Sequence, residues 1–97
     1  MSDFLDLLAL YYLCDATALV RTMSGDEVIA CTGIYDAVKA WFAPFDLAPV
    51  GSLERHAQMI EGYLGFQDWQ AANAELVATM RDDAMAEARG VAGALMR

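Results

Sequence analysis

The N-terminal segment is apolar on almost every side of a helix. Ser2 is a suitable N-cap, and the chain up to Leu13 contains no helix breaker. Polar residues near the two ends of this segment fall on one strip of the helix, but Leu10 and Leu13 interrupt that strip in the central turns. Polar side chains therefore cover no complete face of the helix. This pattern predicts a helix over about residues 2–22 that is buried in the fold or shared with another chain.

Asp15 conflicts with this pattern. In a continuous helix it falls on the same face as Phe4, Leu8 and Leu19, and an unpaired buried carboxylate is costly. We therefore expect the helix to break near Cys14, with Asp15 capping a second short segment. The alternative is a buried acid with a functional role.

The segment Ser24-Gly25-Asp26-Glu27 has the S-x-x-E spacing of a capping box, in which a hydroxyl and a carboxylate satisfy backbone amides at a helix start. A helix over about residues 25–43 should follow. Its apolar face would carry Val28, Cys31, Ile34, Tyr35, Val38, Trp41 and Phe42. The alternative is a β-hairpin over residues 18–32, which the β-branched residues and Gly33 permit.

The second half of the chain predicts another helical pair. Pro44 and Pro49 mark a linker, on which we expect Phe45, Leu47 and Val50 to be pinned to the core.

Ser52 should cap a helix over residues 52–64, with Gly62 and Gly65 ending it and Leu53, Ala57, Ile60 and Leu64 sharing its apolar face. Asp68 should cap a last helix over residues 68–88, whose stripe would be Trp69, Ala72, Leu76, Met80 and Ala84.

These elements predict an all-α fold, a compact four-helix domain of two helical hairpins. The helices are expected at about 2–22, 25–43, 52–64 and 68–88, in a single domain over residues 1–97 whose residues 89–97 fray. The alternative is an α+β fold with the hairpin at 18–32.

Composition and charge narrow the classes of partner. Apolar residues make up 58% of the 97, which excludes a disordered chain and leaves few polar groups to cover the surface. Fourteen acidic residues against six basic ones give a net charge of -8, which disfavours direct contact with nucleic acid or an anionic membrane. No leader or membrane span is visible, and we expect a cytoplasmic protein.

The chain has two cysteines, Cys14 and Cys31, and both lie inside apolar runs. A reduced cysteine in such a run behaves as a small hydrophobic residue. We therefore expect two free thiols and not a structural disulfide.

Three motifs occur together in residues 36–76: Asp36-Ala37-Val38-Lys39, a Ser52-led helix with Gln58, and Gly65-Phe66-Gln67-Asp68-Trp69. In this combination they resemble a short helical domain that carries the label glyoxalase-superfamily protein. The last motif predicts a helix–turn–helix corner, in which Gly65 ends one helix and Asp68 caps the next. The clustered His and Glu ligands of a metal-dependent glyoxalase are missing here, so the resemblance implies no activity.

The chain carries no recognisable catalytic, cofactor or metal motif. His56 is the single histidine, and its place at the border of a helix predicts contact with solvent. No phosphate-binding loop, dinucleotide fingerprint or C-x-x-C pair is present. We therefore expect no enzyme, no cofactor and no metal.

Five carboxylates recur every seven residues: Glu54, Glu61, Asp68, Glu75 and Asp82. Within each helix they line up on one edge, with about 10 Å between neighbours. Such a row resembles the phosphates of a nucleic acid, or it is simply a solvated face.

Three function hypotheses follow. The first is a small acidic non-catalytic protein–protein interaction module, a homodimer or a subunit of an assembly, which binds through Leu10 and Leu13. The alternative is an acidic inhibitor of a nucleic-acid-handling complex, a nucleic-acid mimic of the phage or plasmid type, like anti-CRISPR or anti-restriction proteins. A third class is a small enzyme or ligand carrier that uses Asp15 or His56.

Overall fold

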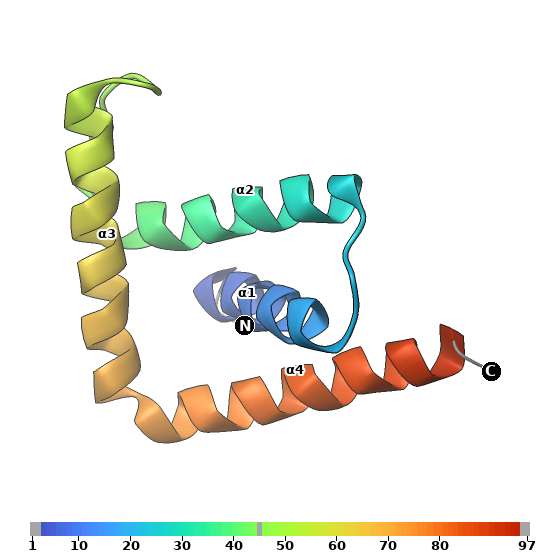
Figure 1. Ribbon diagram of the computed structural model, residues 1–97. Coiled ribbons are helices and arrows are strands. Elements are labelled where there is room, and N and C mark those ends of the chain that lie inside the picture. Colours follow the sequence, from blue (N-terminus) through green and yellow to red (C-terminus); the bar gives the residue numbers. More distant parts are fainter. Residues whose placement is uncertain (1–2, 45, 96–97) are drawn as a thin grey trace.

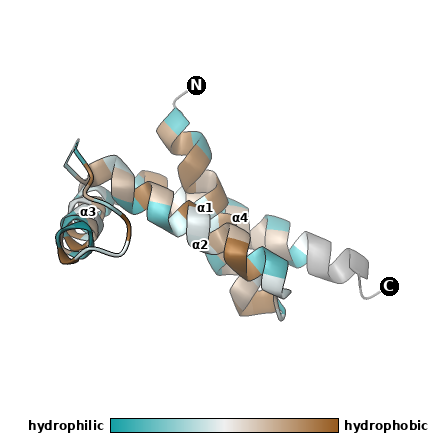
Figure 2. Ribbon diagram, turned by 90° about the horizontal axis from the view of Figure 1, so that it is seen from above, coloured by the Kyte–Doolittle hydropathy of each residue, from teal (hydrophilic) through white to brown (hydrophobic). Residues whose placement is uncertain are grey.

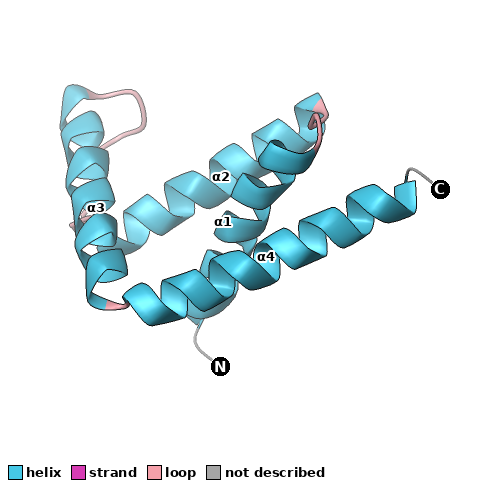
Figure 3. Cartoon of the chain, turned by 60° about the horizontal axis from the view of Figure 1, so that its bottom comes forward, coloured by secondary structure: helices cyan, strands magenta, loops and turns pink. Residues whose placement is uncertain are grey.

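A computed structural model describes residues 3–44 and 46–95, with side chains up to residue 90. It contains four helices, α1 (Asp3–Val20), α2 (Gly25–Phe42), α3 (Leu53–Ala72) and α4 (Ala74–Leu95) (Figure 1). Within the described residues there is no strand (Figure 3). The all-α class is confirmed, and the hairpin at 18–32 is wrong because these residues end α1 and begin α2.

Two of the predicted helix starts are formed by the expected caps. The Ser24 hydroxyl accepts from the Glu27 amide and the Glu27 carboxylate accepts from the Ser24 amide, which completes the capping box of α2. The Ser52 hydroxyl accepts from the Arg55 amide at the start of α3. Ser2 lies outside the described residues.

The helix α1 lies between α2 and α4 (Figures 1 and 3). Its buried side chains lie on more than one face: Phe4, Leu8, Tyr12, Cys14 and Ala16. This arrangement explains why α1 is apolar all round, since its own chain covers it from two sides.

The expected break of α1 at Cys14 is wrong. The helix continues to Val20, and Asp15 is exposed rather than buried. Its carboxylate accepts a hydrogen bond of 2.8 Å from the Tyr35 hydroxyl of α2. The helix needs no break because the carboxylate stays in water and Leu19, the apolar neighbour one turn on, is exposed as well.

Aromatic side chains from the first three helices form much of the core. Phe4 packs against Trp41, Phe42 and Trp69, with ring centroids between 5.0 and 5.4 Å apart. Tyr12, Phe66, Leu8 and Val38 are the largest fully buried side chains. The core therefore joins residues of α1, α2 and α3 that lie far apart in the sequence, and α4 adds Val77, Ala84 and Ala88 to it.

The prediction that Gly62 and Gly65 end a helix is wrong, because α3 runs through both to Ala72. A Cβ at Gly62 would lie 2.1 Å from the Lys39 carbonyl oxygen, and one at Gly65 would lie 3.0 Å from the Cβ of Phe42. These glycines let the backbones of α2 and α3 approach closely. Asp68 is consequently an exposed residue within α3 and caps nothing.

The corner lies at Asn73, between α3 and α4. The backbone amide of Asn73 donates to the carbonyls of Trp69 and Gln70, and its side-chain amide donates to Trp69. The two helices diverge from this corner, so the predicted second hairpin is wrong: α3 packs on α2, and α4 packs on α1 (Figure 1).

The end of α4 lies beyond the predicted one. The helix reaches Leu95, so residues 89–95, for which we expected fraying, are helical. Met96 and Arg97 lie outside the described residues.

Polar contacts tether the linker to α3. The Gln58 side chain accepts from the Ala48 amide and donates to the Asp46 carbonyl, and Arg55 donates to the Ala48 carbonyl. Val50, which we expected on the core, is 85% exposed, whereas Leu47 is half-buried. Phe45 lies outside the described residues.

Candidate protein-binding surfaces

The helix α3 has two sides of different character. Its inner side packs on the rest of the molecule through the buried residues Gln58, Gly62 and Phe66. Trp69 and Arg55 on the same side are half-buried. This side supplies the buried contacts between α3 and the rest of the fold.

The outer side of α3 is apolar and exposed. The face predicted from Leu53, Ala57, Ile60 and Leu64 is present, but all four side chains are exposed and none belongs to the core. Leu53 is 90% exposed, Leu64 56% and Ile60 49%. We call these four residues the α3 seam. Figure 2 shows α3 close to end-on, with hydrophobic and hydrophilic positions on the same helix.

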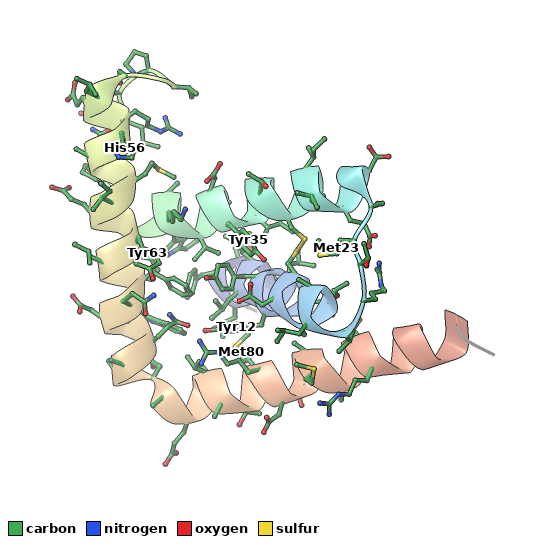
Figure 4. The ribbon with its side chains drawn as sticks, viewed as in Figure 1. Tyr12, Met23, Tyr35, His56, Tyr63 and Met80 are labelled. Carbon is green, nitrogen blue, oxygen red and sulfur yellow. A yellow bond between two sulfur atoms is a disulfide. The ribbon has the colours of Figure 1, made fainter. Side chains whose placement is uncertain are left out.

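Carboxylates border the α3 seam on one edge. Glu54, Glu61 and Asp68 are all exposed, and the continuous helix through Gly65 places them in one row about 21 Å long. His56 and Tyr63, which are labelled in Figure 4, lie along the opposite edge of the seam. Lys39 of α2 joins them around a shallow pocket.

The remaining two carboxylates of the predicted row lie elsewhere. Glu75 and Asp82 belong to α4, which leaves α3 at the Asn73 corner in a different direction. Both are exposed. The structure therefore gives one row of three acidic residues on α3, and the five do not form a single ladder.

Leu10 and Leu13 line a cleft between α1, α2 and α4. The cleft has a volume of about 280 Å³, and Ile34 of α2 and Ala88 of α4 contribute to its walls. Leu10 is half-exposed, whereas Leu13 packs against the core. Met23, in the loop between α1 and α2, also lines this cleft (Figure 4).

A disulfide forms part of the cleft wall, which corrects the expectation of free thiols. Cys14 of α1 and Cys31 of α2 are bonded, with their Cα atoms 5.8 Å apart (Figure 4). The two cysteines face each other in the packed interface between α1 and α2. Their place in this interface explains why both occur in apolar runs of the sequence. Disulfides are typical of oxidising compartments, so this bond does not favour the cytoplasmic location that we expected from the sequence.

An ion pair closes one end of the same cleft. Arg21 Nη1 donates to Glu27 Oε1 over 2.9 Å, and Nη2 donates to the other carboxylate oxygen. The Arg21 guanidinium, followed by the Ser24 amide, lowers the pKa of the Glu27 carboxyl to about 2. This pair joins the end of α1 to the capping box that begins α2.

A second polar group holds the α3–α4 corner against α1. The Tyr12 hydroxyl donates to Gln70 Oε1 over 2.6 Å, and Arg81 donates to the same oxygen. The Arg81 guanidinium also lies 5.3 Å from the centre of the Tyr12 ring. Burial raises the pKa of Tyr12 to about 12, so its hydroxyl remains a donor at neutral pH. Tyr12 and Met80 lie between α1 and α4 (Figure 4).

The two residues considered for a catalytic or ligand-binding role lie on different helices. His56 is exposed on α3, and Asp15 is exposed on α1. Among the described residues, no group of three or more His, Cys, Asp or Glu side chains is placed to hold a metal ion. No helix in the described part of the chain has the length and apolar character to cross a membrane.

The chain has no significant match among protein-family models, curated proteins or solved structures. The resemblance of residues 36–76 to a glyoxalase-superfamily domain therefore stays a prediction. Its structural interpretation is wrong, since the Gly65 to Trp69 motif lies within α3 and forms no corner.

The exposure of the α3 seam was missed because an apolar face is normally assigned to the core. One sequence signal identifies the true inner side: Gly62, Phe66 and Trp69 recur at helical spacing opposite the seam. A small residue followed by two aromatic ones favours close packing. Two apolar sides on one helix indicate that the fold covers only one of them.

Proposed function

We propose that this chain is a small acidic non-catalytic protein–protein interaction module that binds its partner through the α3 seam. The observation that carries the proposal is the exposure of Leu53, Ile60 and Leu64 on one side of a helix whose other side already anchors it to the fold. Contiguous exposed apolar side chains on a soluble protein mark interaction sites.

The α3 seam supports this function better than Leu10 and Leu13 do. The apolar character of α1 pointed to an interface, but α2 and α4 of the same chain cover much of it. Binding through Leu10 and Leu13 remains a prediction. The half-exposed side chain of Leu10 at the cleft supports it. By contrast, no described element covers the α3 seam.

A photo-crosslinking experiment in the organism that encodes the chain tests this proposal. A benzophenone amino acid replaces Leu64 in the seam, Leu10 in the cleft, or the exposed Ala78 of α4. We expect a discrete adduct from position 64 that disappears when Ile60→Glu is added, and none from position 78. Adducts from position 10 alone, or from none of the three, would refute binding through α3.

The nucleic-acid mimic is the alternative function, and the row of Glu54, Glu61 and Asp68 on one continuous helix supports it. A mimic binds through charge, so its action falls as salt rises and does not need the apolar seam. Reversing Glu54, Glu61 and Asp68 to Lys would abolish inhibition by a mimic. Ile60→Glu distinguishes the two functions, because it would leave a mimic active.

A further inference from the structure

The α3 seam has the spacing of a coiled-coil interface. Leu53, Ala57, Ile60 and Leu64 follow one another at intervals of four, three and four residues, which is the d-a-d-a order of a heptad repeat. Two further turns continue this register with Gln67 and Ala71, both exposed. A surface of this periodicity matches the apolar stripe of another helix.

The same register gives each border of the seam a defined role. Glu54, Glu61 and Asp68 directly follow d positions, so they occupy the e positions. His56, Tyr63 and Gln70 precede a positions and occupy the g positions. Charges at e and g contact the flanks of a partner helix and set partner choice. This face therefore presents three carboxylates on one flank and no carboxylate on the other.

Nothing described in the chain neutralises this acidic flank. The ion pair found among the described residues joins Arg21 to Glu27, far from α3 in the sequence. The single arginine of α3, Arg55, points to the linker and donates to Ala48. The three carboxylates are therefore free to meet cations on a partner.

A second copy of the chain is a poor occupant. It would offer three large aliphatic side chains and two small alanines to the seam, together with its own acidic flank. Its one lysine, Lys39, borders the g side, and each copy carries a net charge of -8. Binding to this small apolar seam therefore requires additional attraction between opposite charges, which a second copy does not supply.

We infer that the α3 seam binds a basic amphipathic helix of another protein, with the apolar stripe of that helix on the seam and its Lys or Arg side chains against Glu54, Glu61 and Asp68. The inference rests on the proposed function and adds the class of partner to it. Alanine at position 57 leaves space for a large side chain of the partner at the middle of the contact.

Two synthetic helical peptides of equal composition test the inference by fluorescence anisotropy. Both are about three heptads long, with Leu at a and d. The basic-flank peptide has Lys at e and g and Glu at b and c, and the acidic-flank peptide has these charges exchanged. Their net charge is the same, and like charges at e and g keep each peptide from pairing with itself.

Two double variants of the protein provide the matched control. Glu61→Lys with Asp68→Lys reverses the flank of the α3 seam, and Asp82→Lys with Asp83→Lys reverses two exposed carboxylates of α4. Each acid-to-lysine change adds two charges, so both variants go from -8 to -4. Circular dichroism checks that both remain helical.

The basic-flank peptide should bind the unchanged protein about tenfold more tightly than the acidic-flank peptide, because several exposed charge pairs act together. The α4 variant should keep this preference, and the α3 variant should lose or reverse it. Equal affinities, no binding of either peptide, or a preference that survives in the α3 variant would overturn the inference. Crosslinking at position 64 would still stand in those cases, so the partner class and the proposed function fail separately.

Discussion

At the scale of single residues, two glycines within helices have different surroundings. Gly62 lies where α2 and α3 approach, with no room for a Cβ, whereas a Cβ at Gly33 of α2 would meet nothing within 4 Å. The local sequence around each glycine is compatible with a helix. Neighbouring turns therefore do not reveal the difference, which depends on the carbonyl of Lys39 in another helix.

These two glycines give a matched pair of substitutions. Gly62→Ala should destabilise the protein by about 2 kcal/mol or more, because the methyl group forces α2 and α3 apart. Gly33→Ala should stabilise it by about 0.5–1 kcal/mol, because alanine favours an exposed helix. Urea denaturation of the two variants measures both changes, and an equal effect at both positions would contradict the close approach of the helices.

Glu27 predicts a pH-dependent contribution to stability. Its pKa is lowered from 4.5 in the unfolded chain to about 2 in the fold, so the ionised carboxylate stabilises the native state above pH 4.5. That stabilisation should be lost as the pH falls from about 4.5 to about 2. Glu27→Gln keeps a capping-box side chain without the charge.

Melting temperatures of the unchanged protein and of Glu27→Gln should therefore differ near neutral pH and converge at about pH 2. A difference that stays constant across this range would show that the Arg21–Glu27 pair contributes no charge-dependent stability.

At the scale of elements, the starts of α2 and α3 were predictable and the boundary between α3 and α4 was not. Ser24 and Ser52 act through hydrogen bonds to amides only a few residues away, so their spacing in the sequence was sufficient. The end of α3 depended on packing, because α2 holds the helix straight through Gly62 and Gly65 until Asn73. Asp68 was predicted to be an N-cap because its side chain is short and charged. The same properties suit a solvated residue on the surface of a helix.

The α1–α2 pair predicts a measurable effect of reduction. The disulfide closes a loop with a sequence separation of 17, and a cross-link of that size stabilises a fold by about 3 kcal/mol. A thiol reductant should therefore lower the melting temperature of the protein. The double variant Cys14→Ala, Cys31→Ala should melt at a lower temperature whether or not reductant is present. A melting temperature that reductant does not change would contradict a stabilising role of the bond.

At the scale of the whole molecule, the arrangement of helices leaves α3 as a helix covered on one side. The described chain measures 48 × 32 × 22 Å, and α2 and α4 leave α3 in roughly the same direction with α1 between them (Figure 1). The all-α class followed from periodicity. The exposed α3 seam did not, because an apolar face identifies buried surface without telling whether its own chain or another one covers it.

The net charge and the small seam predict a monomer. Sedimentation velocity should give a single species of 10.6 kDa at neutral pH, because repulsion between copies of charge -8 opposes contact through three aliphatic side chains. A dimer that Leu64→Glu dissociates would show instead that a second copy covers the seam.

Nuclear magnetic resonance of the ¹⁵N-labelled protein, titrated with the basic-flank peptide, tests the central claim most directly. We predict that the largest amide shift changes lie on the outer side of α3, around Leu53, Ile60 and Leu64, and that the amides of Leu10 and Leu13 change little. Changes centred on the cleft between α1, α2 and α4, or no changes at saturating peptide, would contradict a binding surface on α3.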